Sequence, residues 1–289
     1  MGDVTPSRAD RAPGRRRRGP GWVPNQHGAW AMLVLPLVVG AVDVGASWWH
    51  VLLLAAWLSA YLAFYATGLW LKARRRARYL PPVRAYAGTT AVLGGLAIAA
   101  EPSVLRWGVV YAPLLAVSLV LTARRADRSV ANDLVTVLAA SLMAVVARAT
   151  SRDDTSWLPG GDDPRAWVVA AVLLAYFAGT VPYVKTMIRE RGNRRMYAAS
   201  AGLHGAYVVV AGVWAATAGV GAEGWSSAGA GSGGDASGPV LATALTVLAL
   251  ALAVRAVVVP RRWPTASPRA VGIGEIVACA LLAAVLLLT

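Results

Sequence analysis

Nine apolar stretches of membrane-spanning length follow one another along this chain. They cover residues 27–44, 48–71, 83–100, 107–122, 130–149, 166–184, 199–220, 239–259 and 271–289. A helix needs about 20 apolar residues to cross a hydrocarbon core of about 30 Å. The chain has 57% hydrophobic and 15% charged residues, whereas about 25% of residues are charged in a soluble domain. We therefore predict an all-α, polytopic membrane helix bundle of about nine transmembrane helices.

The segments that connect these stretches alternate in charge. Lys and Arg gather before the first stretch and in segments 72–84, 123–129, 185–197 and 255–269, which together hold 24 of the 28 basic residues. The intervening segments carry eight of the 14 acidic residues. Because cytoplasmic loops retain Lys and Arg, we predict that the N-terminus lies inside and the C-terminus outside. A composition rich in Ala, Val and Arg is typical of a GC-rich genome, and we expect a multi-pass protein of the bacterial inner (cytoplasmic) membrane.

Two segments outside the apolar stretches differ in composition. Residues 1–24 contain four consecutive arginines among Pro and Gly and lack the cleavage site of a signal peptide. We expect them to form a disordered basic arm on the cytoplasmic side. The Gly- and Ser-rich residues 221–238 are expected to form a flexible outer loop, so that residues 25–289 make a single transmembrane domain. The net charge of +14 belongs to these topology signals and predicts no nucleic-acid partner.

The start of the first apolar stretch carries a distinctive motif. Residues 24–32 read PNQHGAWAM and are followed by Leu35-Pro36-Leu37 and Gly40. This motif resembles the signature of the YwiC-like family of uncharacterised bacterial membrane proteins. Residues 182–205, PYVKTMIRERGNRRMYAASAGLHG, resemble that family's other distinctive segment, and the resemblance covers nearly the whole chain. The family implies no known activity.

A second resemblance concerns the scaffold. LAFYA at 62–66 and LAYFA at 174–178 both lead into clusters of basic residues. Together with the helix number and the orientation, this echo is similar to the UbiA-type intramembrane prenyltransferases. Those enzymes have nine helices and hold magnesium and a prenyl diphosphate on acidic motifs in the loops after the second and sixth helices. Here segment 72–84 has no carboxylate and segment 185–197 has only Glu190, so the family's metal chemistry is not carried over.

Neither a metal nor a cofactor is predicted for this chain. Cys279 is the single cysteine and lies in an apolar stretch, which excludes an internal disulfide and a cysteine metal cluster. No Walker loop, Rossmann glycine pattern, HExxH or GxSxG motif occurs in the sequence. Nor does any helix centre carry the series of acidic residues expected of a proton-driven pump. The motifs of soluble enzymes are therefore absent, and whether the protein is an enzyme is left open.

Basic residues in segments 72–84 and 185–197 are the first candidates for a functional site, because guanidinium and ammonium groups contact phosphate directly. A helical continuation of the sixth stretch would align Lys185 with Arg189 and Arg191 with Arg195. The alternative is that these charges only fix topology and attract anionic lipid. The predicted anion-binding residues are Lys72, Arg75, Arg76, Lys185, Arg189 and Arg191.

Polar residues at the inner ends of the first and seventh stretches are the second candidates. Asn25, Gln26 and His27 adjoin the membrane edge, and His204 lies between two glycines. A histidine can donate a proton near neutral pH, so we predict polar or proton-handling roles for these four residues. The alternatives are an interfacial polar cap beside Trp30 and a helix-to-helix hydrogen bond by His204.

These observations favour a membrane protein that binds a phosphorylated or otherwise anionic amphiphile, such as a lipid or isoprenoid phosphate, at a cytoplasmic-side cationic site. The lipid bilayer is its other expected partner, and the oligomeric state is not predicted. Two alternatives are a divergent intramembrane prenyltransferase and a small-molecule or lipid transporter. A purely structural, partner-binding protein also fits the sequence.

Overall fold

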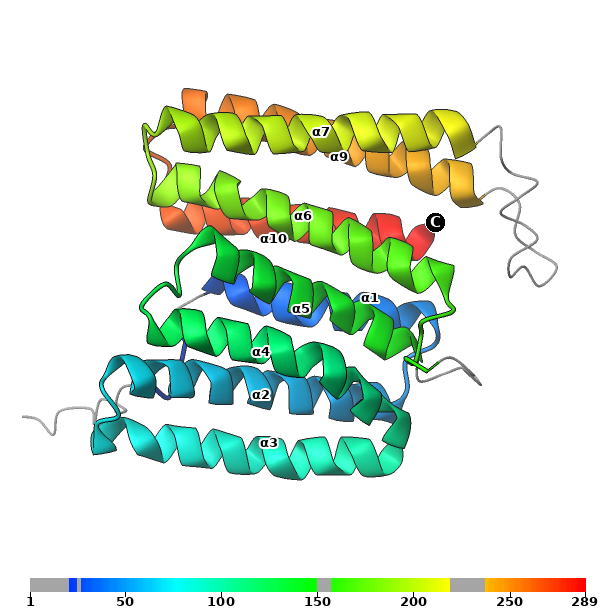
Figure 1. Ribbon diagram of the computed structural model, residues 1–289. Helices are drawn as coiled ribbons and strands as arrows, with labels where there is room; N and C mark the ends of the chain where they lie inside the picture. Colours follow the sequence, from blue (N-terminus) through cyan, green and yellow to red (C-terminus); the bar gives the residue numbers. More distant parts are fainter. Residues whose placement is uncertain (1–20, 25–26, 150–156, 219–236) are drawn as a thin grey trace, which may run out of the picture.

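The computed structural model describes residues 21–24, 27–149, 157–218 and 237–289 (Figure 1). Within these ranges the chain forms nine long helices and two short 3-10 helices, and no strand. The long helices are α1 (His27–Asp43), α2 (Trp48–Lys72), α3 (Leu80–Ala100), α4 (Gly108–Ala123), α5 (Val130–Ala149), α6 (Pro164–Ile188), α7 (Arg194–Ala218), α9 (Ser237–Arg262) and α10 (Pro268–Leu288). The short ones, η2 (Ala77–Tyr79) and η3 (Pro102–Trp107), precede α3 and α4.

Eight of the described helices are long and apolar enough to cross a membrane, η2 and η3 being counted with the helices that follow them. The ninth, α1, contributes the shorter apolar segment Trp30–Asp43. The predicted all-α, multi-pass membrane bundle is therefore confirmed. Several helices extend further into the basic segments than the apolar stretches do, because Lys and Arg favour helices and their long side chains reach past the apolar layer.

The helices alternate in direction, so that their ends gather at two opposite faces of the bundle (Figure 1). α7 and α9 lie together along one edge, α3 lies along the other, and α1, α5 and α6 lie between them. In the most apolar part of α5, 50% of the residues are buried inside the protein. In the corresponding part of α3, only 6% are. α5 is thus an interior helix, whereas α3 turns most of its surface outward.

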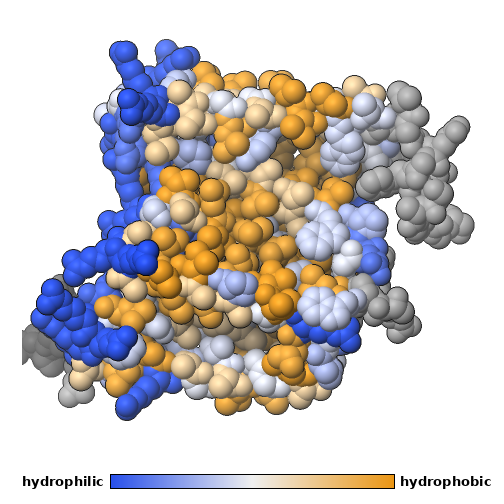
Figure 2. All heavy atoms as spheres, in the orientation of Figure 1, coloured by the Kyte–Doolittle hydropathy of each residue, from blue (hydrophilic) through white to orange (hydrophobic). Residues whose placement is uncertain are grey.

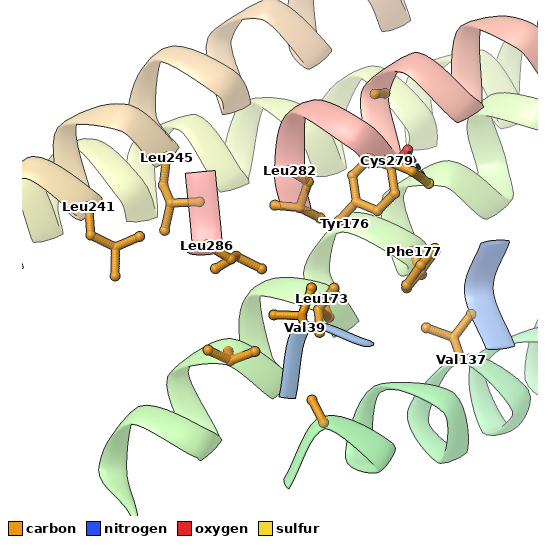
Figure 3. Close-up of a cluster of buried hydrophobic side chains, with 13 residues drawn as sticks. Val39, Val137, Leu173, Tyr176, Phe177, Leu241, Leu245, Cys279, Leu282 and Leu286 are labelled. Carbon is orange, nitrogen blue, oxygen red and sulfur yellow. Dashed lines mark hydrogen bonds between the residues drawn. The ribbon is translucent and has the colours of Figure 1, made fainter. Parts of the chain in front are cut away.

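Side chains of five helices meet in the largest buried cluster (Figure 3). Val39 of α1, Val137 of α5, Leu173 of α6, Leu245 of α9 and Leu282 of α10 are among its members. No hydrophobic effect drives helices together within lipid, so their association depends on close packing. This cluster joins the helices near the centre of the bundle.

Hydrophilic side chains gather at one end of the bundle (Figure 2). At this end α2, α4, α6 and α9 finish and α3, α5, α7 and α10 begin. We call it the basic end and the opposite one the acidic end, after the loops that the sequence places there. The described basic loops thus lie together, as the alternation of charge predicts, while the side of the membrane that they face stays a prediction.

Most of the predicted arm 1–24 and of the predicted outer loop 221–238 lies outside the described residues. Of the arm, residues 21–24 are described and contact the start of α3. The Tyr86 hydroxyl donates to the Trp22 carbonyl at 2.5 Å, and the two rings meet edge to face at 5.8 Å. The segment that leads into α1 is therefore held against α3 at the basic end.

Candidate functional site

α2 ends in a sharp turn that presents arginines at the basic end. Arg74 and Arg75 have positive φ angles of 54° and 59°, which are uncommon for residues other than glycine. The backbone N–H of Arg75 donates to the Trp70 carbonyl at 2.8 Å, and its guanidinium carbon lies 5.8 Å from the centroid of the Trp70 ring. Arg76 follows at the N-cap of η2. All three arginines are exposed.

Lys72, just before this turn, pairs with the loop between α4 and α5. Its Nζ lies 2.9 Å from Oδ2 of Asp127. Partial burial by itself raises the pKa of Asp127. The hydrogen bond and the attraction from Lys72, together with a backbone hydrogen bond and the charge of Arg128, outweigh it and lower that pKa below its ordinary value. Asp127 is therefore ionised at neutral pH and ties its loop to the end of α2.

Lys185, near the end of α6, also pairs with a carboxylate. Its Nζ lies 2.6 Å from Oδ2 of Asp133 on α5 and donates to the Arg128 carbonyl at 3.2 Å. The loop between α4 and α5 thus joins the ends of α2 and α6, although the sequence marked it only as a short basic segment. Two of the six predicted anion-binding cations accordingly have partners within the protein.

The start of α5 combines interhelical contacts with capping. The side chain that caps α5 is that of Ser129, whose Oγ accepts from the N–H of Asn132 at 3.2 Å. The Asn132 side chain is buried instead, accepting from Ser118 of α4 at 2.7 Å and donating to the Asp127 carbonyl at 3.1 Å. These contacts fix the loop that carries Asp127.

The predicted helical continuation of α6 through Arg195 is wrong. α6 ends at Ile188, Gly192 has a φ of 79°, and α7 begins at Arg194. A glycine readily adopts this left-handed conformation and ends a helix. Asn193 then caps α7, since its side-chain oxygen accepts from the N–H of Arg195 at 3.0 Å. Arg191 and Arg195 consequently do not lie on one helical stripe.

Arg191 holds two segments of the backbone together. Its Nε donates to the Met187 carbonyl and its Nη2 to the Ala266 carbonyl, each at 2.6 Å. The second contact connects the α6–α7 loop to the loop between α9 and α10. Arg189, which caps α6, is exposed. Segment 185–197 holds three of the predicted cations. Of these, only the Arg189 side chain contacts neither a carboxylate nor a backbone carbonyl among the described residues.

The predicted polar residues near α1 are only partly described. Asn25 and Gln26 lie outside the described residues, and His27 begins α1 without a described side chain. His204 on α7 is buried, and its Nδ1 lies 2.8 Å from the Ser200 carbonyl one turn earlier. Its ring packs against Gly179 of α6, where a Cβ would meet the ring at 3.3 Å. The hydrogen bond of His204 thus lies within α7, and the ring meets α6 by packing. A helix-to-helix hydrogen bond and a proton-handling role stay predictions.

An ion pair inside the membrane-spanning region is the main feature that the sequence analysis missed. Nη1 of Arg255 on α9 lies 2.6 Å from Oε1 of Glu275 on α10. Each residue lies about two turns, or roughly 10 Å, inside its helix from the basic end. The hydroxyls of Tyr176 and Thr180 on α6 donate to Oε2 of Glu275, each at 3.2 Å.

Two further side chains complete this pair's surroundings. The Arg255 guanidinium carbon lies 4.2 Å from the centroid of the Tyr183 ring. The Tyr176 hydroxyl lies 3.4 Å from Sγ of Cys279 (Figure 3). A sequence signal for the site was present, because Arg255 falls within stretch 239–259 and Glu275 within stretch 271–289. Ionisable residues inside a membrane mark a functional site by default.

A second buried charge network ties helices together at the acidic end. Nη2 of Arg148 on α5 lies 2.9 Å from Oδ2 of Asp163, and its Nη1 contacts Asp43 of α1. Arg165 also pairs with Asp43, at 3.0 Å. Asp163 caps α6 through the N–H groups of Arg165 and Ala166. Two arginines that depart from the charge alternation are thus neutralised by neighbouring acids, which explains why they are tolerated at this end.

Comparison with known proteins places the chain in a family. A sequence profile of YwiC-like proteins matches residues 23–148. The uncharacterised protein YwiC of Bacillus subtilis (strain 168) is 32% identical over 183 residues, which are 63% of this chain and 73% of that protein. The chain belongs to the YwiC-like family. An uncharacterised protein of Haemophilus influenzae (strain ATCC 51907 / DSM 11121 / KW20 / Rd) is 29% identical over 182 residues, 63% of this chain and 74% of that protein.

The YwiC-like profile covers α1 to α5, a shorter part of the chain than the motif resemblance indicated. It includes Lys72 and Asp127 but neither Lys185 nor the Arg255–Glu275 pair. No solved structure matches the chain, so similarity to the UbiA-type scaffold stays a prediction. Among the described residues, no group of three or more His, Cys, Asp or Glu side chains is arranged to hold a metal ion.

Proposed function

We propose that the basic end of this YwiC-like protein binds a phosphorylated or otherwise anionic amphiphile, such as a lipid or isoprenoid phosphate. The observation that carries the proposal is the exposure of Arg75, Arg76 and Arg189 beside the ends of α2 and α6. None of the three pairs with a carboxylate within the described part of the chain. A guanidinium offers phosphate a planar fork of N–H donors.

The contacts at this end divide the six predicted cations into two groups. Lys72 and Lys185 hold the α4–α5 loop, and Arg191 holds the loop between α9 and α10. The other three cations point to solvent and remain available for a ligand. We therefore narrow the proposed contact residues to Arg75, Arg76 and Arg189.

Arg75 gives the proposed site its link to the membrane surface. Tryptophan favours the depth of the lipid headgroups, and the Arg75 guanidinium lies over the Trp70 ring. One face of the guanidinium is thereby covered, while its N–H groups can reach a phosphate at headgroup depth. An amphiphile would bind with its phosphate on the arginines and its chain along the apolar helices.

The test compares two triple variants that each lose three exposed charges at the basic end. R75Q/R76Q/R189Q removes the proposed contacts, and R195Q/R262Q/R269Q is the matched control. Native mass spectrometry in an uncharged detergent measures binding of an isoprenoid monophosphate, phosphatidylglycerol and phosphatidylcholine. We expect the first variant to lose at least tenfold in affinity for one of the two anionic ligands, whereas the control variant keeps that affinity. Phosphatidylcholine should bind the natural chain and both variants with the same affinity. An equal loss in both variants would show general attraction of anions and overturn the proposal.

The two alternatives can be tested on the same preparation. A divergent prenyltransferase would transfer label from a prenyl diphosphate with magnesium present, and a transporter would accumulate its substrate in reconstituted vesicles. The carboxylates that hold magnesium in the UbiA-type enzymes have no counterpart in segment 72–84. Binding without chemistry is therefore the function that we put forward.

A further inference from the structure

Arg255 carries N–H donors that are buried but not used. Its Nε and Nη2 atoms are inaccessible to solvent and have no hydrogen-bond partner among the described residues. Only Nη1 is occupied, by Glu275. Buried donors are paired in nearly all native structures, because leaving one unpaired is costly. The free donors of Arg255 therefore indicate that an acceptor belongs beside them.

The position of the free donors defines the kind of acceptor. Nε–H and one N–H of Nη2 point in parallel from one edge of the guanidinium plane, and this edge makes two-point contacts with carboxylate and phosphate. Tyr183 covers the face of the plane, where a ring contacts the π system and not the in-plane N–H groups. Tyr183 thus leaves the N–H groups of this edge without an acceptor, and an oxyanion that offers two acceptor oxygens matches them.

Charge limits the ligand further. Arg255 and Glu275 form a neutral pair, and an added anion would leave a net negative charge inside the membrane, which is costly. Neutrality returns if Glu275 takes up one proton when one monoanion binds. We propose that Arg255 and Glu275 form an intramembrane, proton-coupled binding site for a monoanionic oxyanion, namely a carboxylate or a lipid phosphodiester.

The binding step balances in charge and protons. The oxyanion binds the two-point edge of Arg255, one proton passes from water to a Glu275 carboxylate oxygen, and no covalent bond to carbon changes. The hydroxyls of Tyr176 and Thr180 now donate to Glu275. A hydroxyl can also accept, so Glu275 keeps a hydrogen-bond partner in its protonated form.

The site lies where two parts of the bundle meet. α9 packs mainly on α7 and only sparsely on α6 and α10 (Figure 1), so the Arg255–Glu275 pair joins the α7–α9 pair of helices to the rest. The other titratable groups that face the pair are Tyr176 and Tyr183 of α6, Cys279 of α10 and, towards Arg255, His204 of α7.

The test uses the full chain in an uncharged detergent. Octanoate supplies a carboxylate, phosphatidylglycerol a lipid phosphodiester, and octanol is the uncharged control, with affinity taken from the rise in unfolding temperature. We expect one anionic probe to bind the natural chain, and which one binds identifies the source of the oxyanion. Because one proton is taken up, the apparent Kd should rise about tenfold per pH unit.

Four variants make the result specific. Arg255→Lys keeps the charge but lacks the two-point edge, so affinity should fall at least tenfold, while R262K on the same helix should bind normally. E275Q keeps the shape of Glu275 without its charge, so binding should become independent of pH. R75Q/R76Q/R189Q should leave binding at this site unchanged, which separates it from the proposed function.

Some results would overturn the proposal. They are binding of neither anion above octanol, equal affinity in Arg255→Lys, and an apparent Kd that does not change with pH in the natural chain. The first two results would mean that the free donors of Arg255 bind no anion, and the third that binding takes up no proton. If E275Q does not fold, Arg255→Lys and the pH dependence of the natural chain still decide the outcome.

Discussion

The Lys185 ammonium on α6 lies 2.6 Å from the Asp133 carboxylate on α5. The two side chains are only 13% and 28% exposed, so a residue predicted to bind an external anion is already held by an internal one. A partly buried ion pair of this kind contributes about 1–3 kcal/mol, between the values for exposed and fully buried pairs. The same carboxylate therefore stabilises the fold and withholds one cation from the ligand.

Replacing Asp133 by Asn should reverse both effects. We expect the free energy of unfolding to fall by about 1–3 kcal/mol, because a partly buried ion pair is lost. The affinity for an anionic lipid should rise, because Lys185 becomes available. Chemical unfolding and native mass spectrometry measure the two quantities. D162N, at an exposed acid of the acidic end, should change stability by less than about 0.5 kcal/mol. Unchanged stability in D133N would show that the pair contributes nothing.

Arg148→Gln should be among the most damaging single changes. The Arg148 side chain is 3% exposed and pairs with both Asp43 and Asp163. Removing one partner of a buried ion pair costs about 3–5 kcal/mol, because the remaining charge has no compensation. We expect a large loss of folded protein on size-exclusion chromatography. R165Q, at a side chain that is 36% exposed, should cost about 1 kcal/mol or less.

A charge-free variant distinguishes electrostatics from packing at this site. D43N/R148Q/D163N removes both carboxylates together with Arg148, so no uncompensated buried charge remains apart from the more exposed Arg165. The folded yield should recover in part relative to Arg148→Gln. If the folded yield of the triple variant is lower than that of Arg148→Gln, packing rather than charge explains the loss of folded protein.

Gly40→Ala should weaken the contact between α1 and α5. A Cβ at this position would collide with the Ala144 carbonyl and lie 3.0 Å from the Ala147 side chain. Overpacking of this kind costs about 1–3 kcal/mol, measured as a lower unfolding temperature. G94A is the matched control, because nothing lies within 4 Å of a Cβ there, and it should unfold at the same temperature or slightly higher.

Orientation can be read by labelling substituted cysteines. Cys279 is the chain's one cysteine and is buried, so C279S provides a background without cysteine. In intact bacterial cells a membrane-impermeant maleimide should label D162C at the acidic end, and it should label R76C at the basic end only after the cells are opened. The reverse pattern would place the basic end outside and contradict the predicted topology.

The helices themselves were predictable because span length is a local property. α5 covers the predicted residues 130–149, whereas α6 continues past the predicted end at 184 to Ile188. Apolar content does not mark where a helix stops, since Lys185 is helical as well. The end of α6 depends on Gly192 and Asn193, whose backbone conformation and capping contact are found only in the folded chain.

The candidate site was predictable in its location but not in its partners. Segments 72–84 and 185–197 both lie at the basic end, yet the loop with Asp127 and the start of α5 with Asp133 occupy two of their cations. Several stretches are hydrophobic all round, so the sequence does not say which face of a helix meets a neighbour. The pairs of Lys72 and Lys185 could not be foreseen for this reason.

The sequence by itself determined a multi-pass helical protein with its basic loops at one end, because span length and charge bias are read along a single dimension. Only the tertiary structure decided which charged side chains pair with each other inside the protein. Asp43 and Arg165 are 122 positions apart yet lie 3.0 Å from each other, and Arg255 meets Glu275 inside the bundle. Such pairs depend on how neighbouring helices are ordered and rotated, and packing in three dimensions sets both.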